Sequence, residues 1–192
     1  MSKTVISLSA IRDLLWDSFE VRKVLVVCPL RVASVWKNEV KKWDHLKDLR
    51  VSVAVGTETE RRMALARDAE IYVINRENTA WLVEKSGAAL DYDMLVVDEL
   101  FSFKNSQSKR FKALMQLRPK VKRVVGLTGT PAPNGLMDLF AEYKLLDKGE
   151  RLGRFISSYR AEYFRPDKTN GLVVYSYKPL PFAEEEIYRK NR

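Results

Sequence analysis

The chain has 192 residues, of which 46% are hydrophobic and 31% charged, and it carries a formal net charge of +9 with a pI of about 9.6. This composition excludes a disordered chain and suits one domain with a sizeable core; no apolar run reaches the roughly 18–20 residues of a membrane-spanning helix, and the N-terminus lacks the shape of a secretory signal. The excess of Lys and Arg favours polyanionic partners such as nucleic acid, although many basic proteins bind none.

The first residues raise the question of a nucleotide site. Lys3 and Thr4 run directly into an apolar helical pattern, and Lys-Thr at the start of a helix is also how the phosphate-binding loop G-x-x-x-x-G-K-[ST] ends. Ser2 stands where that loop has its last glycine, Met1 stands where the rest of the loop would be, and the front of the loop is not in the sequence. Either Lys3 and Thr4 are ordinary helical residues, or the chain starts inside its own nucleotide site.

Short β-branched runs then alternate with helical patterns. The runs are nearly continuous apolar stretches, as expected of strands in a parallel sheet that is buried on both faces. They lie at residues 24–28, 51–55, 71–74, 94–97 and 123–128. Helices are predicted over residues 32–43, 58–67, 106–117 and 135–146, the second opened by a Thr57–Glu60 capping box and the last by Asn134 as N-cap. The alternation predicts a doubly wound α/β domain.

The sequence offers few residues that could bind zinc or form a disulfide. Cys28 is the one cysteine and lies in the first apolar run, which indicates a buried thiol in a reducing compartment, by default the cytoplasm. His45 is the one histidine, so the usual zinc ligands are lacking.

The four tryptophans lie in helical patterns, which favours packing over base stacking: Trp16, Trp36, Trp43 and Trp81.

Two predicted strands end in polar clusters, and ligands of open parallel sheets bind at such ends. Asp98 and Glu99 follow the fourth strand; an Asp here can hold Mg²⁺ and a Glu can orient a water, but an acidic pair can also simply close a strand. Thr128, Gly129 and Thr130 follow the fifth strand and could sense a γ-phosphate, or form a plain turn. Each cluster alone is ambiguous.

The pattern changes after about residue 150. RFISSYRAEYF is a helical and aromatic stretch, TNGLVVYSYKPLP indicates a turn followed by a strand, and AEEEIYRKNR begins another helix. A division into a domain over residues 1–150 and an extension over residues 151–192 is therefore expected.

The motifs taken together resemble a known family. SKT, VLVVCPLRVASVWKNEVKKW, VVDELFSFKN and VVGLTGTPAPNG are similar, in order and spacing, to the first RecA-like motor lobe of superfamily two helicases, and more narrowly to the Swi/Snf-type DNA translocases. The resemblance covers about residues 2–190. It implies a P-loop NTPase-type parallel sheet flanked by helices, a small C-terminal helical and β extension, and, from the compact style and the D-E-L box, a phage or prophage origin.

The resemblance also implies ATP, Mg²⁺ and duplex DNA as cofactors and partner. Lys3 would reach the β- and γ-phosphates with Ser2 beside it, Thr4 and Asp98 would hold Mg²⁺, and Glu99 would be the catalytic base. Motif III would couple nucleotide state to DNA grip through Thr128, Gly129 and Thr130. Three residues of motif Ia would hold the DNA backbone: Arg31, Ser34 and Lys37.

Departures from the family pattern define the alternatives. The front of the phosphate loop and the strand before it are missing, so the 123–128 strand is expected to present an unpaired edge that could form a homodimer. The second RecA-like lobe, which carries the family's arginine finger, is also missing, so the chain is expected to be a motor fragment that is inactive alone. A degenerate or split-gene product that binds DNA or a partner protein without hydrolysis is the alternative; an unrelated small nucleotide hydrolase would need a complete phosphate loop.

Overall fold

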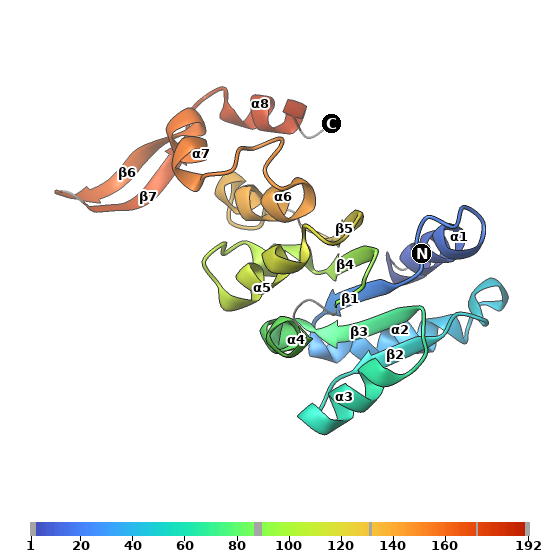
Figure 1. Ribbon diagram of the computed structural model, residues 1–192. Helices are drawn as coiled ribbons and strands as arrows, with labels where there is room; N and C mark the ends of the chain where they lie inside the picture. The colour runs from blue at the N-terminus through green and yellow to red at the C-terminus, as the bar shows by residue number, and fades with distance from the viewer. Residues whose placement is uncertain (1–2, 87–89, 131, 172, 191–192) are drawn as a thin grey trace. The chain divides into compact units, whose positions relative to one another are not determined.

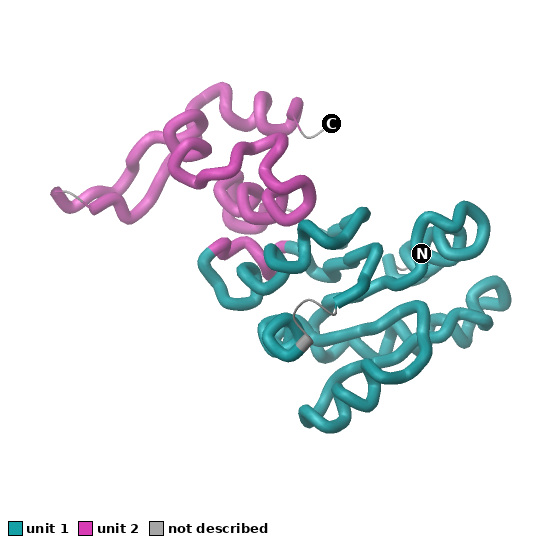
Figure 2. Tube along the Cα trace, in the orientation of Figure 1, with its two compact units in different colours: residues 1–100, 107–129 teal, residues 101–106, 130–192 magenta. Residues whose placement is uncertain are grey.

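The structure is a computed structural model that describes residues 3–86, 90–130, 132–171 and 173–190. The chain divides into two compact units, shown in Figure 2: unit 1 comprises residues 1–100 and 107–129, and unit 2 comprises residues 101–106 and 130–192. Each unit is described by itself. The expected domain division at residue 150 stays a prediction.

Unit 1 is built on a parallel sheet of five strands in the order β2-β3-β1-β4-β5 (Figure 1). The strands are β1 (Val24–Cys28), β2 (Val51–Ala54), β3 (Ile71–Asn75), β4 (Met94–Asp98) and β5 (Arg123–Leu127). All five were predicted from the sequence to within one residue at each end. Every residue of β1, β3 and β4 is buried, which explains why these strands read as continuous apolar runs.

Five helices flank this sheet: α1 (Lys3–Trp16), α2 (Ala33–Val40), α3 (Glu58–Ala66), α4 (Thr79–Ser86) and α5 (Lys109–Leu117). Short 3-10 turns lie between them at η1 (Leu30–Val32), η2 (Asp44–Leu46) and η3 (Arg76–Asn78), and η5 (Leu100–Phe103) begins at the last residue of unit 1 before the chain enters unit 2. α1 and α2 share one hydrophobic core with alternate residues of β1, β3 and β4. Because right-handed crossovers send the connections from β2, β3 and β4 the other way along the sheet, α3, α4 and α5 cover its opposite face.

Helix ends follow the local sequence in most places. The capping box is confirmed: the Thr57 hydroxyl accepts from Glu60 N at 3.3 Å, and the Glu60 carboxylate accepts from Thr57 N at 2.7 Å. The helix predicted over 32–43 is shorter, since α2 ends at Val40. Trp43 therefore lies outside it and is 38% exposed, so its predicted packing role was wrong, whereas Trp36 is fully buried.

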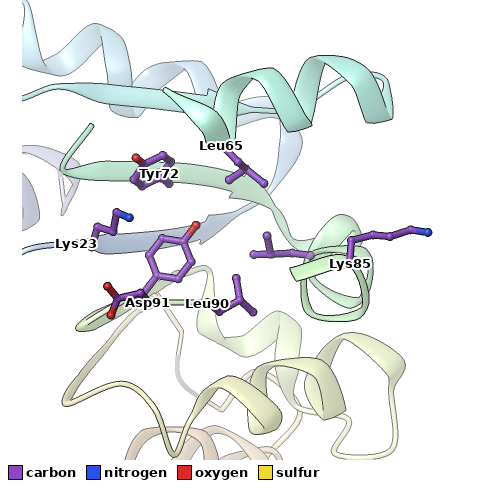
Figure 3. A pocket seen from close by; sticks show the side chains of 8 residues that line it. Lys23, Leu65, Tyr72, Lys85, Leu90 and Asp91 are labelled. Carbon is purple, nitrogen blue, oxygen red and sulfur yellow. The ribbon is translucent and has the colours of Figure 1, made fainter. Parts of the chain in front are cut away.

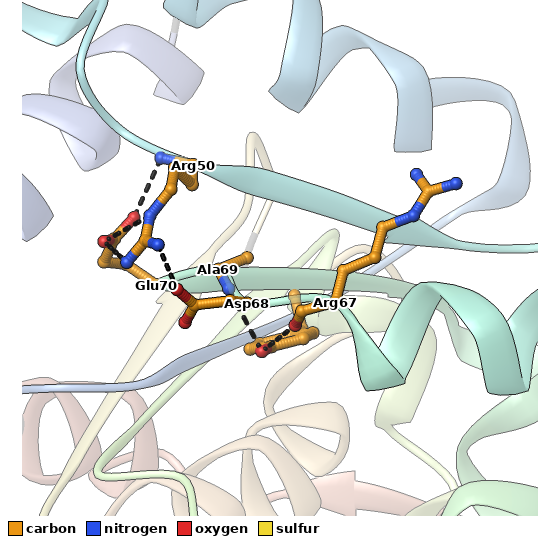
Figure 4. Close-up of polar contacts among 6 residues, drawn as sticks. Arg50, Arg67, Asp68, Ala69 and Glu70 are labelled. Atoms are coloured by element: carbon orange, nitrogen blue, oxygen red, sulfur yellow. Dashed lines mark hydrogen bonds and ion pairs between the residues drawn. The ribbon is translucent and has the colours of Figure 1, made fainter.

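An ion-pair cluster joins the starts of β2 and β3 (Figure 4). Arg50 donates from its backbone N and from Nε to the two carboxylate oxygens of Glu70, at 2.8 and 2.9 Å, and also pairs with Asp68. The hydroxyl of Tyr72 donates to the carbonyl of Arg67 at 2.6 Å. These contacts raise the pKa of Arg50, chiefly through its hydrogen bond to Glu70, and they fix the amino ends of the two strands.

Unit 2 contains η6 (Leu136–Asp138), α6 (Leu139–Asp147), α7 (Ile156–Tyr163), the antiparallel strands β6 (Phe164–Asn170) and β7 (Val173–Pro179), and α8 (Ala183–Lys190). Its core centres on Tyr159, whose ring lies 5.5 Å from Phe140 and 5.3 Å from Tyr163. The sequence predicted α7, β7 and α8. It missed β6, because a mostly exposed strand carries no apolar alternation.

The predicted N-cap at Asn134 was wrong. The residue before η6 is Gly135, in a left-handed backbone conformation with φ of 102°, and no side chain caps this turn. Asn134 instead donates hydrogen bonds to the Asp138 carboxylate from its backbone N and from Nδ2. A glycine at this position permits a chain reversal that other residues resist, so the Asn134 side chain lies outside capping geometry.

Two strands form the edges of the sheet. Among the described strands β5 pairs with β4 alone, and its residues are partly exposed where those of β4 are buried. Nothing in the described part of the chain is a helix both long and apolar enough to cross a membrane.

Candidate nucleotide site and nucleic-acid face

The candidate site begins where β4 ends. Asp98 is the last residue of the strand, is 8% exposed and stands in register with Leu127 of β5. Glu99 follows with a φ of 58°, in the left-handed region that side chains other than those of Gly, Asn and Asp seldom occupy. Strained backbone of this kind clusters at functional sites, because the surrounding structure must hold it. This backbone makes the acidic pair the candidate centre of a site.

Asp98 has a hydrogen-bond donor that the sequence did not reveal. The indole Nε1 of Trp36 lies 3.3 Å from Oδ2 of Asp98, and the tryptophan is fully buried. Burial raises the pKa of Asp98, and the nearby Glu99 charge adds to this, whereas the Trp36 hydrogen bond and the Lys3 charge lower it. The sequence analysis assigned Trp36 to packing and did not predict this hydrogen bond.

The first turn of α1 reaches the same point. Lys3 Nζ lies 3.9 Å from Oε1 of Glu99, with the two side chains 45% and 29% exposed. Thr4 is buried beside it, at 8% exposure. A helix N-terminus carries a partial positive charge and free N–H groups that favour phosphate. The structure therefore brings Lys3 to Glu99 across 96 residues of chain, while Ser2 lies outside the described residues.

The oxygen atoms at this point suit Mg²⁺ held together with phosphates. Asp98 offers a mostly buried carboxylate and Thr4 a hydroxyl, both hard ligands. Across the described ranges no three His, Cys, Asp or Glu side chains group closely enough to hold a metal ion by themselves. Mg²⁺ commonly binds through one or two carboxylates plus substrate phosphates rather than in an all-protein cage, so this donor set fits it.

The motif III residues continue β5, the neighbour of β4. Thr128 and Gly129 belong to unit 1 and Thr130 to unit 2, so the chain passes between units within this motif. A Cβ built on Gly129 would meet no atom within 4 Å, and its φ is not positive. Among the residues that the structure describes, no neighbouring atom therefore requires glycine at this position.

The predicted DNA-contacting residues lie close together in the sequence of unit 1, on η1 and α2. Arg31 belongs to η1, and Ser34 and Lys37 lie one turn apart on α2; all three are exposed. The opposite side of the same helix buries Trp36, the donor to Asp98. One short helix thus presents basic and hydroxyl groups to solvent and an indole N–H to the acidic pair.

A cavity elsewhere in unit 1 is distinct from this site (Figure 3). Its volume is about 260 Å³, and its lining includes Lys23, which precedes β1, and Asp91 and Tyr92, which precede β4. These residues lie at the amino ends of the strands, whereas the acidic pair lies at a carboxyl end. Burial raises the pKa of Tyr92, so its hydroxyl stays neutral at physiological pH.

Comparison with known proteins gives matches over nearly all of the chain. The SNF2-related domain family matches residues 1–160. The p41 protein of Acyrthosiphon pisum secondary endosymbiont phage 1 is 36% identical over 194 residues, which cover 97% of this chain and 42% of the phage protein. The human DNA repair and recombination protein RAD54B is 28% identical over 172 residues, covering 90% of this chain and 18% of that protein.

Among solved structures, the Sulfolobus solfataricus SWI2/SNF2 ATPase core in complex with dsDNA superposes with a TM-score of 0.71 at 27% identity. The match covers 84% of this chain and 32% of the archaeal chain. The chain therefore spans less than half the length of each of these similar proteins.

Proposed function

The chain belongs to the SNF2-related domain family, and from this premise we propose that it is the ATP-binding lobe of a DNA-dependent ATPase that couples hydrolysis of MgATP to movement on duplex DNA. The observation that carries the proposal is the meeting of the α1 N-terminus and the end of β4, where Lys3 lies 3.9 Å from Glu99 and next to buried Asp98. This supplies a cation, a helix N-terminus and two carboxylates at the carboxyl edge of a RecA-like sheet.

Each residue has a distinct part in the proposed reaction. Lys3 binds the β- and γ-phosphates, with Ser2 in the adjoining backbone, and its ion pair with Glu99 loosens as phosphate takes its place. Thr4 and Asp98 hold Mg²⁺, which when bound neutralises phosphate charge. Glu99 accepts a proton from the attacking water, and its carboxylate lies within 3.9 Å of Lys3.

DNA binding occupies the exposed face of α2 and η1 in this proposal. Arg31 and Lys37 contact backbone phosphates electrostatically and Ser34 donates a hydrogen bond, without reading bases. Thr128, Gly129 and Thr130 link the nucleotide to the DNA, because they leave the sheet beside β4 and lead out of unit 1. The archaeal neighbour that is bound to dsDNA supports duplex DNA as the partner.

We further propose that the chain is half of a motor and turns over little ATP alone. The chain covers only 32% of the archaeal ATPase core and 42% of the phage protein. A second RecA-like lobe would complete the nucleotide site with an arginine finger. A cytoplasmic setting belongs to this proposal as well, since the fully buried Cys28 thiol suits a reducing compartment.

A second candidate is binding of DNA or a partner protein without hydrolysis. Two observations favour it: Ser2 stands where the phosphate loop has its last glycine, and Lys3 is 45% exposed at the first turn of its helix. Glycines expose backbone N–H groups to phosphate, so their loss would weaken ATP binding.

The test measures ATP binding and DNA-stimulated phosphate release by this chain and by a longer protein that adds a complete phosphate loop and a second lobe. We expect release from the longer protein only, and we expect Glu99→Gln to abolish release while ATP binding persists. A longer protein that binds DNA but releases no phosphate would refute the proposed ATPase function. The second candidate, binding without hydrolysis, would then be favoured. Glu84→Gln, on the exposed side of α4, is the matched control.

A further inference from the structure

Two chain segments leave the sheet side by side after the candidate site. Asp98 and Leu127 are paired in the β4–β5 register, so the segments that begin with Glu99 and Thr128 start from adjacent positions. The first passes into unit 2 after Leu100 and the second after Gly129. Within unit 2 the first segment comprises residues 101–106, and it groups with the chain from residue 130 onward rather than with the sheet.

A polar cluster in unit 2 ties the two segments together again. Lys104, from the first segment, places Nζ 3.6 Å from Oδ2 of Asp138 in the second. Asn134 donates to that same oxygen from its backbone N at 3.2 Å and from Nδ2 at 3.1 Å. The Asp138 side chain is only 14% exposed and that of Lys104 is 37% exposed, so water screens this pair less than a surface ion pair.

The next turn of α6 places a second acid under the cluster. Glu142 is 1% exposed, and its Oε1 has no hydrogen-bond partner among the described residues. Burial raises the pKa of Glu142 to about 8; the negative charge of Asp138 adds to the rise and Lys104 opposes it. Near neutral pH a largely protonated Glu142 leaves Asp138 as the carboxylate that Lys104 faces.

We propose that Lys104, Asn134 and Asp138 form a clasp that positions Glu99 and the motif III residues by closing the two segments into a ring. One side of this ring is the β4–β5 register and the other is the Lys104–Asp138 ion pair. Lys104 lies five residues beyond Glu99, and Asn134 lies five residues beyond Gly129. Because the two segments are joined to each other at both ends, fewer conformations are open to Glu99 and to Thr128–Thr130 than in two separate segments.

The catalytic significance of the clasp rests on the proposed function, but its existence can be tested without ATP turnover. Amide hydrogen exchange is followed in this chain for peptides covering residues 99–106 and 128–134. The variants are Lys104→Met and Asp138→Asn, which remove a charge at similar size, and Lys104→Arg, which keeps it. Asp167→Asn is the matched control, since Asp167 pairs with Lys178 at 3.0 Å in the β6–β7 hairpin of the same unit.

We expect about five- to tenfold faster exchange in both peptides for Lys104→Met and for Asp138→Asn, because each removes the partly buried Lys104–Asp138 ion pair. Lys104→Arg and Asp167→Asn should exchange as the parent does. The double variant Lys104→Met/Asp138→Asn should be no faster than either single one, since both remove one interaction. Parent-like exchange in β1 and β3 peptides would show that each variant is folded.

Unchanged exchange in either single variant would overturn the clasp. So would Lys104→Arg behaving like Lys104→Met, because packing rather than charge would then hold the segment. Adding Mg²⁺ and an ATP analogue separates this result from the proposed function. If neither the parent nor any variant gains protection at residues 99–106 on adding nucleotide, the proposed nucleotide binding is refuted. The comparison of the variants without nucleotide still tests the clasp in that case.

Discussion

Trp36 donates its indole hydrogen to the carboxylate of Asp98, with 3.3 Å between Nε1 and Oδ2. The bond joins α2 to the end of β4 inside the core of unit 1, and both side chains are buried. Hydrogen bonds to a metal-binding carboxylate orient it and keep it ionised. The helix that faces solvent with Ser34 and Lys37 is thereby in direct contact with the residue proposed to hold Mg²⁺.

Trp36→Phe should weaken Mg²⁺-dependent ATP binding about tenfold or more, which is the usual cost of losing an outer partner of a metal ligand. The pKa of Asp98, already raised by burial, should rise further without the donor. Protons then compete more strongly with Mg²⁺, so the deficit should grow as pH falls from 7.5 to 5.5. Titrations of a fluorescent ATP analogue at several Mg²⁺ concentrations measure this. Trp81→Phe, on α4, is the control; equal Mg²⁺ dependence in the two variants would count against the role of Trp36.

Glu99→Gly should make the chain more stable by about 0.5 kcal/mol while removing the proposed base. Left-handed backbone costs a side chain roughly 1–2 kcal/mol, and glycine is spared this cost but loses about 0.5–1 kcal/mol of chain entropy. Glu99 holds such a conformation, with φ of 58°. Urea denaturation of the parent, Glu99→Gly and Glu99→Gln measures the difference. Glu99→Gln keeps a side chain at this φ and should show no gain; a Gly variant less stable than the Gln variant would argue against backbone strain.

Glu142→Gln should change how stability depends on pH. Its folded-state pKa of about 8 lies above the unfolded value of 4.5. The stability that Glu142 contributes through this shift is therefore fully present below pH 4.5 and is lost as the pH rises through 8. The Gln variant lacks this loss. We compare the free energy of unfolding of the Gln variant minus that of the parent at two pH values. This difference should be roughly 2–4 kcal/mol larger at pH 8.5 than at pH 4.5. Denaturation curves across this range test it, and parallel pH profiles would show that Glu142 ionises normally.

The β5 edge should support self-association. Unpaired strand edges present N–H and C=O groups to other chains, and β5 is partly exposed along its length. We expect concentration-dependent dimers in sedimentation velocity, and we expect Val124→Lys to reduce them several-fold. Val51→Lys, on the β2 edge of the same sheet, is the control. A parent chain that stays monomeric at high concentration would refute the predicted dimer.

Local sequence was enough for the elements whose reasons are local. All five strands were predicted from apolar runs, and for β1, β3 and β4 the reason is that a strand buried on both faces favours apolar residues along its length. The capping box of α3 followed from a Thr and a Glu three residues apart. The placing of Asp98 and Glu99 at a strand end followed as well, since the apolar run stops there.

Only the tertiary structure decided which of these elements meet. Trp36 and Asp98 lie 62 residues apart, and nothing in a helical pattern distinguishes an indole that donates to a carboxylate from one that only packs. Lys104 and Asp138 are likewise brought together by the fold of unit 2. In the same unit Asn134, which the sequence predicted as an N-cap, donates a hydrogen bond to Asp138 instead. Periodicity is set by neighbours along the chain, whereas these pairings depend on how distant segments pack: strand order places the end of β4 beside α2, and the fold of unit 2 brings Lys104 to Asp138.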